Sequence, residues 1–157
     1  MDGGHTLARC EEVTDAVLQA TFGQLFAHRV HLDGMILKPN MVISGKKCAA
    51  RASPQEVAVA TARCLKRHVP AAVPGIAFLS GGQSESEATL HLDLINRIGG
   101  LPWALTFSYG RALQESAIRT WAGKQETFAA GQQAFLKRAR LNGLARLGQY
   151  QPGLEAA

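Results

Sequence analysis

The sequence predicts an α/β protein with a parallel sheet, because three short apolar stretches alternate with longer amphipathic ones along its 157 residues. Strands that are joined through helices of this length run parallel, with right-handed crossovers. Hydrophobic residues make up 46% of the chain and charged residues 18%, which is typical of a folded globular protein. We therefore expect residues 1–157 to form a single domain with the element order α, βα, βα, βαα.

The first half of the chain should hold two helices and one strand. Residues 11–28 show helical spacing, and their buried stripe is expected to contain Val13, Val17, Leu18 and Leu25. Residues 35–41 are a short apolar run, interpreted as a buried strand. A strong helix start follows, because Ser53 can cap, Pro54 suits the first helical position and Glu56 completes a capping box. That helix should end near His68 and bury Val57, Ala60, Cys64 and Leu65.

The second half repeats the strand–helix alternation. Strands are expected over residues 75–79 and 103–109, with Trp103 packed in the core or at the end of the sheet. Ser84 and Glu87 form a second capping box, which opens a helix running to about residue 98. Its apolar stripe should consist of Leu90, Leu94 and Ile98. Two more helices are expected over residues 111–122 and 126–147.

The carboxyl ends of the three expected strands should meet at one rim of the sheet, where parallel α/β proteins carry their functional groups. Those ends hold residues 38–40 (KPN), 80–83 (SGGQ) and 108–111 (SYGR). Each strand is mostly apolar, so we expect each to be buried on both faces. Asp33 precedes its strand and should therefore lie at the opposite rim.

Lys38 is the first candidate functional residue, because it interrupts an apolar run inside an expected strand. Burial disfavours the charged ammonium and lowers the pKa of a lysine. A neutral amine can attack a carbonyl and form a Schiff base, whose protonated form accepts electrons from a breaking bond. The alternative is a lysine at the end of a strand whose ammonium reaches solvent.

Two loops that each join a strand to a helix form a candidate phosphate site. Residues 80–82 (SGG) supply glycines that let backbone N–H groups approach an anion. Residues 108–111 repeat the arrangement one strand later, where a helix N-terminus and Arg111 add positive charge. Ordinary glycine turns are the alternative for each loop taken alone.

Composition narrows the function classes further. The three cysteines have neither zinc-like spacing nor a C-x-x-C pair, and we interpret them as reduced thiols of a cytoplasmic protein. The five histidines lack metal-ligand spacing, and no apolar stretch is long enough to cross a membrane. The net charge is +5, which indicates solvated surface or a field that attracts a small anionic substrate. Nucleic-acid binding is disfavoured, because aromatic residues are only 6% of the chain.

Taken together, the motifs LKPNMV, VPGIAFLSGGQSE and LTFSYGRALQ resemble the last three barrel strands of class I fructose-bisphosphate aldolase, in that order. The likeness extends from CEEVTDAVL to the last helix. The resemblance implies parallel βα units of a TIM (β/α)8 barrel, here incomplete, with three of eight strands and the C-terminal helices. It also implies reversible cleavage of fructose 1,6-bisphosphate to dihydroxyacetone phosphate and glyceraldehyde 3-phosphate, in glycolysis and gluconeogenesis.

Site residues follow from the same resemblance. Lys38 matches the Schiff-base lysine of the family, and no metal or other cofactor is implied, because the imine does the work of the metal ion in the other aldolase class. The residues that match the phosphate-binding positions are Ser80, Gly81, Gly82, Ser108, Gly110 and Arg111.

The match also lacks parts of the family pattern. Residues 1–5 resemble the stretch just after the fifth barrel strand, so strands one to five and the family's catalytic glutamate have no counterpart. The chain ends in QPGLEAA, without the terminal tyrosine of many members. Two functions are therefore expected as alternatives. One is a lyase, whole or reconstituted with a complementing aldolase fragment or as a homo-oligomer. The other is a non-catalytic remnant that binds sugar phosphates or a partner aldolase chain.

Overall fold

A computed structural model describes residues 1–156 and contains one sheet of three parallel strands. These are β1 (Ile36–Leu37), β2 (Gly75–Phe78) and β3 (Ala104–Phe107), in the order β1-β2-β3. Leu37 pairs with Ile76, and Ile76 pairs with Leu105. The expected parallel α/β class is confirmed, and the sheet is incomplete relative to the eight strands of a closed barrel.

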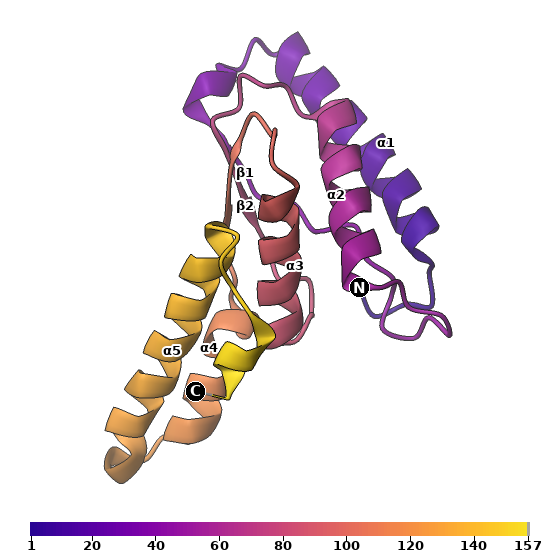
Figure 1. Ribbon diagram of the computed structural model, residues 1–157. Coiled ribbons are helices and arrows are strands. Elements are labelled where there is room, and N and C mark those ends of the chain that lie inside the picture. The colour runs from indigo at the N-terminus through magenta and orange to yellow at the C-terminus, as the bar shows by residue number, and fades with distance from the viewer. Residues whose placement is uncertain (157) are drawn as a thin grey trace.

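Five α-helices accompany the sheet in the described residues: α1 (Leu7–Ala27), α2 (Pro54–His68), α3 (Glu85–Ile98), α4 (Arg111–Trp121) and α5 (Phe128–Arg146). Short 3₁₀ helices, which the sequence did not indicate, occur at Leu32–Gly34, Gln125–Thr127 and Pro152–Glu155. Helices α2 and α3 lie on one side of β1 and β2, and α1 packs outside α2 (Figure 1). None of the helices in residues 1–156 has the length and apolar content of a membrane span.

Both expected capping boxes are confirmed. The Ser53 hydroxyl accepts from the Glu56 N–H at 3.3 Å, and the Glu56 carboxylate accepts from the Ser53 N–H at 2.7 Å. Ser84 and Glu87 make the same reciprocal pair at the start of α3. These local bonds satisfy backbone donors that a helix N-terminus leaves free, which is why the two helices begin where the sequence predicts.

The first strand is shorter than the expected residues 35–41, because the chain turns away from the sheet after Pro39. Proline has no N–H for a sheet ladder. Beyond it, the Val42 N–H donates to Thr61 Oγ1 at 2.9 Å, a side chain on α2, instead of to a strand. This hydrogen bond holds the chain after β1 against α2.

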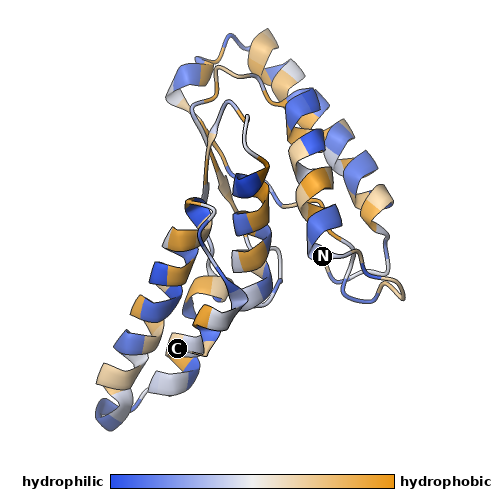
Figure 2. Ribbon diagram, in the orientation of Figure 1, coloured by the Kyte–Doolittle hydropathy of each residue, from blue (hydrophilic) through white to orange (hydrophobic). Residues whose placement is uncertain are grey.

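The expected apolar stripe of α1 is wrong in two of its four positions. Val13 and Val17 are 43% and 57% exposed. The buried residues at helical spacing are Cys10, Thr14, Leu18 and Phe22. Hydrophilic and hydrophobic residues alternate along this helix in Figure 2, and packing on α2 selects a face that includes the polar Thr14.

The expectation that all three strands are buried on both faces is also wrong. Only β2 is almost wholly buried, whereas Ile36 in β1 is 61% exposed and Ala104 in β3 is exposed. Side chains alternate between the two faces of a strand, so Ile36, Gly75 and Ala104 share one face and Leu37, Ile76 and Leu105 the other. The first face is the more exposed one, and the second packs into the core.

The remaining expected core positions divide in the same way. Val57, Ala60, Cys64 and Leu65 of α2 are buried as expected, and so is Trp103, whose indole N–H donates to the Pro70 carbonyl at 3.0 Å. On α3, Leu90 and Leu94 are only half-buried and Ile98 is exposed. The buried positions of α3 are instead Ala88, Thr89, His91, Leu92, Asp93 and Ile95.

A buried arginine connects α5 to α3 and to the C-terminal segment. Arg138 donates to both carboxylate oxygens of Glu155 at 2.8 Å and to Thr89 Oγ1 at 3.1 Å. Its guanidinium also lies 3.7 Å from a carboxylate oxygen of Glu85, in the first turn of α3. Burial raises the pKa of Glu155, but hydrogen bonds from Arg138 and Tyr150 outweigh it and hold that pKa below its ordinary value.

Candidate functional site

The carboxyl ends of the strands lie at one edge of the sheet, as parallel pairing requires. Pairing continues past the strands themselves, because the Leu79 N–H donates to the Pro39 carbonyl at 3.0 Å and the Ser108 N–H to the Phe78 carbonyl at 2.8 Å. The loops that follow β1, β2 and β3 are therefore neighbours at this edge.

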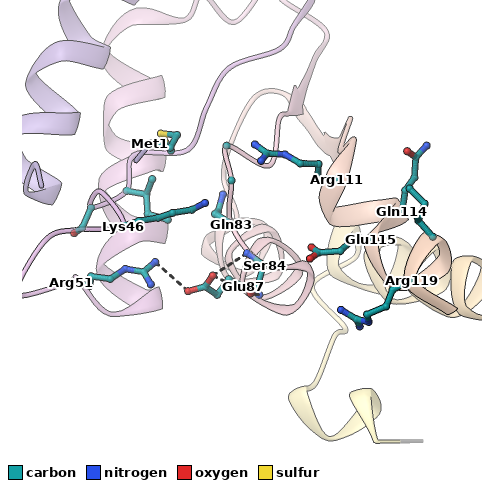
Figure 3. A pocket seen from close by; sticks show the side chains of 15 residues that line it. Met1, Lys46, Arg51, Gln83, Ser84, Glu87, Arg111, Gln114, Glu115 and Arg119 are labelled. Atoms are coloured by element: carbon teal, nitrogen blue, oxygen red, sulfur yellow. Dashed lines mark hydrogen bonds and ion pairs between the residues drawn. The ribbon is translucent and has the colours of Figure 1, made fainter. Parts of the chain in front are cut away.

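A cavity of about 730 Å³ opens at this edge. Three of the residues expected to bind phosphate line it: Gly81, Gly82 and Arg111. The same cavity is lined by Lys46 and Arg51 from the loop after β1, and by Glu115 and Arg119 from α4. Figure 3 shows Lys46 and Arg111 reaching toward one another from opposite sides.

The glycines of the loop after β2 have a conformation that other residues rarely adopt. Gly81 has φ of 58° and Gly82 has φ of 76°. A Cβ on Gly81 would lie 2.9 Å from the Met1 side chain, and one on Gly82 would lie 3.1 Å from Lys46 Nζ. Successive residues in turn conformations of this kind can present backbone N–H groups to an anion.

Two buried side chains, Gln83 and His91, hold this loop through hydrogen bonds. The Gln83 amide donates to the Ser80 carbonyl at 2.8 Å, and its oxygen is hydrogen-bonded to Nδ1 of His91 on α3. Burial lowers the pKa of His91 to about 4; the nearby Glu87 opposes this shift and Arg51 adds to it. The imidazole is therefore neutral at physiological pH, and the Nδ1–H donor that it can offer to Gln83 positions the glycine loop.

Of the two expectations for Lys38, the structure supports the alternative, because the side chain is exposed to solvent. Lys38 lies one residue beyond the Leu37–Ile76 pair, which places it on the exposed face of the sheet with Ile36. Of the residues that the structure describes, those lining the 730 Å³ cavity do not include Lys38.

The other expected binding residues occupy different positions around the edge. Ser80 is buried, with 7% of its surface exposed, while Ser108 and Gly110 are exposed. In the described part of the chain, none of these three lines the cavity with Arg111. Gly110 is the N-cap residue of α4, so Arg111 is the first residue of that helix.

Sequence reasoning assigned no individual role to Lys46 or Arg51 and interpreted the net positive charge as solvated surface or as a field that attracts a small anionic substrate. Lys46 and Arg51 line the cavity, whereas Lys47 is exposed elsewhere. Arg51 pairs with Glu87 at 3.1 Å. Burial raises the pKa of Glu87, but hydrogen bonds from Ser84 and the charge of Arg51 outweigh it and lower that pKa overall.

The cavity as a whole is cationic. It is lined by the positive side chains Lys46, Arg51, Arg111 and Arg119 and by the carboxylates Glu87 and Glu115. A concave site that is lined by an excess of one charge concentrates ligands of the opposite charge. In residues 1–156, no three His, Cys, Asp or Glu side chains form a group that could hold a metal ion.

A parallel sheet with helices packed on one face and a cationic cavity at the carboxyl ends of its strands defines a protein built from the βα units of an α/β barrel. The family model described as "Glycolytic: Fructose-bisphosphate aldolase class-I" matches residues 1–157. The chain belongs to the class I fructose-bisphosphate aldolase family.

Individual relatives agree with this assignment. Fructose-bisphosphate aldolase B of Gallus gallus is 57% identical over 150 residues, which cover 95% of this chain and 41% of the relative. Fructose-bisphosphate aldolase of Drosophila melanogaster is 54% identical over 157 residues, covering 99% and 43%. The chain thus spans about two fifths of the length of the curated relatives it matches.

A solved structure shows the same fold. It is fructose-bisphosphate aldolase from Plasmodium falciparum, in a complex with TRAP and a small-molecule inhibitor. The TM-score is 0.94 at 50% identity, and the match covers 97% of this chain and 44% of that one.

Proposed function

We propose that this chain carries the imine-forming lysine of a class I fructose-bisphosphate aldolase and its phosphate-binding cradle, which is formed by the loops after β2 and β3. The reaction would be the reversible cleavage of fructose 1,6-bisphosphate to dihydroxyacetone phosphate and glyceraldehyde 3-phosphate, a step of glycolysis and gluconeogenesis. The observation that carries the proposal is the cationic cavity at the carboxyl edge of the sheet, in a chain that belongs to this family.

Lys38 would be the nucleophile. Its Nζ would attack the ketone carbon of the sugar phosphate, and loss of water would leave an imine. The protonated imine would take up the electron pair of the carbon–carbon bond that breaks one carbon further along. The side chain is exposed in this chain, and closing an eight-stranded barrel over that face would remove water and favour the neutral amine.

Phosphate binding would come from the loops after β2 and β3. Gly81 and Gly82 would offer backbone N–H groups and Arg111 a charged fork of donors, all of which line the cavity. Ser80, Ser108 and Gly110 would complete the cradle by positioning these two loops or by contacting the phosphate directly.

Calorimetry with dihydroxyacetone phosphate tests the cradle. Arg111→Ala should weaken binding by roughly tenfold or more, because it removes a charge-assisted contact. Arg140→Ala is the matched control, since Arg140 is an exposed arginine on α5 away from the cavity. Equal affinity of Arg111→Ala and the parent chain would refute the cradle.

This chain alone should cleave fructose 1,6-bisphosphate at a rate far below that of an active aldolase. Cleavage also needs a base on the substrate hydroxyl, and general acid–base help is typically worth about 10²–10⁴-fold. Glu87 is engaged by Arg51 and by its capping box. A coupled assay should show activity that rises when a complementing aldolase fragment with the other strands is added. Full activity from the isolated chain, lost in Lys38→Ala, would contradict the expectation that the base comes from the other strands.

A second candidate function is association with a partner aldolase chain, and an exposed apolar groove favours it. Helices α4 and α5 border a groove of about 480 Å³, where Ile118 and Leu136 are 58% and 57% exposed. Apolar surface of this kind is removed from water when a partner chain covers it, which stabilises the complex. Co-purification of the chain with the complementing fragment, lost in Leu136→Glu, would support this function. A chain that stays monomeric and does not bind the fragment would exclude it.

A further inference from the structure

Two cations from separate segments converge on the glycine loop. From the position that a Cβ on Gly82 would take, Lys46 Nζ lies 3.1 Å away and Arg111 Nη2 lies 3.8 Å away. The two nitrogens can therefore be no further apart than the sum of these distances. A phosphate oxygen accepts a charge-assisted hydrogen bond at about 2.8 Å, so a single phosphate group is large enough to contact both cations.

The backbone of the segment that carries Lys46 is held in place by the first residues of the chain. The Lys46 N–H donates to the Met1 carbonyl at 3.0 Å, and the Gly45 N–H donates to the His5 carbonyl at 2.9 Å. The Lys47 N–H donates to the Gly3 carbonyl at 3.1 Å. Lys46 thus reaches the cavity from a fixed backbone position, although its own side chain is half exposed.

A carboxylate already neutralises Lys46 in the free chain. Asp2 Oδ1 lies 3.4 Å from Lys46 Nζ, and the side chains are 84% and 49% exposed. An exposed ion pair of this kind stabilises by about 1 kcal/mol or less. A dianionic phosphate that contacts the glycine loop and Arg111 at the same time should therefore displace Asp2.

We propose that Lys46 binds the phosphate group of the sugar phosphate together with Gly81, Gly82 and Arg111, and that Asp2 competes with the phosphate for Lys46. This inference rests on the proposed function, because it extends the same cradle by one residue. Lys46 supplies a compact charge on a flexible stem, whereas Arg111 supplies a planar fork. The two together favour a dianionic phosphate over a singly charged carboxylate.

Calorimetry at low salt tests the inference, with dihydroxyacetone phosphate and with inorganic phosphate as probes. Lys46→Gln should weaken the binding of both probes by roughly tenfold, as expected for one lost charge-assisted contact. Lys47→Gln removes the same charge from the next residue, outside the cavity lining, and should stay within about twofold of the parent. Asp2→Asn should tighten binding by up to about fivefold, because the competing carboxylate is gone.

The outcomes separate this inference from the proposed function. If Arg111→Ala loses affinity while Lys46→Gln binds like the parent, the role of Lys46 is refuted and the cradle stands. If both variants bind like the parent, or the parent binds neither probe, both the cradle and the role of Lys46 are refuted. If Lys46→Gln affects dihydroxyacetone phosphate but not inorganic phosphate, Lys46 does not contact the phosphate and the inference is wrong.

Discussion

The stability of the chain should fall between pH 7 and pH 5, because His91 must stay neutral in the folded state. Burial lowers the pKa of His91 from 6.5 to about 4. The unfolded chain therefore binds a proton at a higher pH than the folded chain does. Stability is fully present above the unfolded pKa and is lost as the pH falls toward the folded one.

The magnitude follows from those two pKa values. One pKa unit corresponds to about 1.4 kcal/mol, so the free energy of unfolding should fall by about 2 kcal/mol between pH 7 and pH 5 and by about 3 kcal/mol at pH 4. His91 is only 4% exposed, so solvent screens this effect little. Burial raises the pKa of Asp93, so that carboxyl opposes the loss as it takes up a proton. The hydrogen bond to Arg63 lowers the pKa of Glu11, which adds a further loss at lower pH.

Urea unfolding followed by circular dichroism at pH 7, 6 and 5 measures this dependence. His91→Gln removes the titrating group and keeps a hydrogen-bonding side chain beside Gln83, so its stability should change with pH by less than half as much as that of the parent. His28→Gln, at an exposed histidine that follows α1, should keep the full dependence. Equal pH dependence in the parent and in His91→Gln would show that His91 does not cause the loss of stability.

Two further predictions concern packing and charge. Gly131→Ala should destabilise the chain by about 1–3 kcal/mol, because the added Cβ would lie 2.8 Å from the Trp121 Cβ. Gly143→Ala meets no atom within 4 Å and should stabilise the chain by up to about 1 kcal/mol. Equal effects of the two variants in urea unfolding would contradict this prediction. Arg138→Met should lower the free energy of unfolding by about 1–3 kcal/mol, since it leaves the part-buried carboxylate of Glu155 without its two charged hydrogen bonds. A loss below about 1 kcal/mol would show that the buried pair is not structural.

Much of the fold could be predicted because its signals are local. Each capping box is a pattern of two residues three positions apart, and both helices that open with one begin as expected. Apolar runs before glycine or proline located all three strands. The buried face of α1 could not be predicted in this way, because it depends on contacts with distant residues: the Asn40 side chain donates to Thr14 Oγ1 at 3.4 Å.

The site was predictable where chain topology determines position. Gly81, Gly82 and Arg111 follow the strands directly, so the parallel order of β2 and β3 alone brings them together. Lys46 lies in a loop without periodicity, which is fixed by backbone bonds to residues 1–5. The sequence left the burial of Lys38 open, because a strand residue is desolvated only where another layer covers its face. Ile36 and Lys38 both lie on the exposed face.

Trapping of an imine shows directly whether Lys38 is the nucleophile. The chain is incubated with dihydroxyacetone phosphate, reduced with borohydride, digested and mapped by mass spectrometry, alone and with a complementing aldolase fragment. If Lys38 is the nucleophile, one reduced adduct forms at Lys38. It should be stronger with the fragment and absent in Lys38→Arg, whose guanidinium stays protonated and cannot attack. An adduct spread over Lys46, Lys47 and Lys66, with none at Lys38 under either condition, would contradict that role.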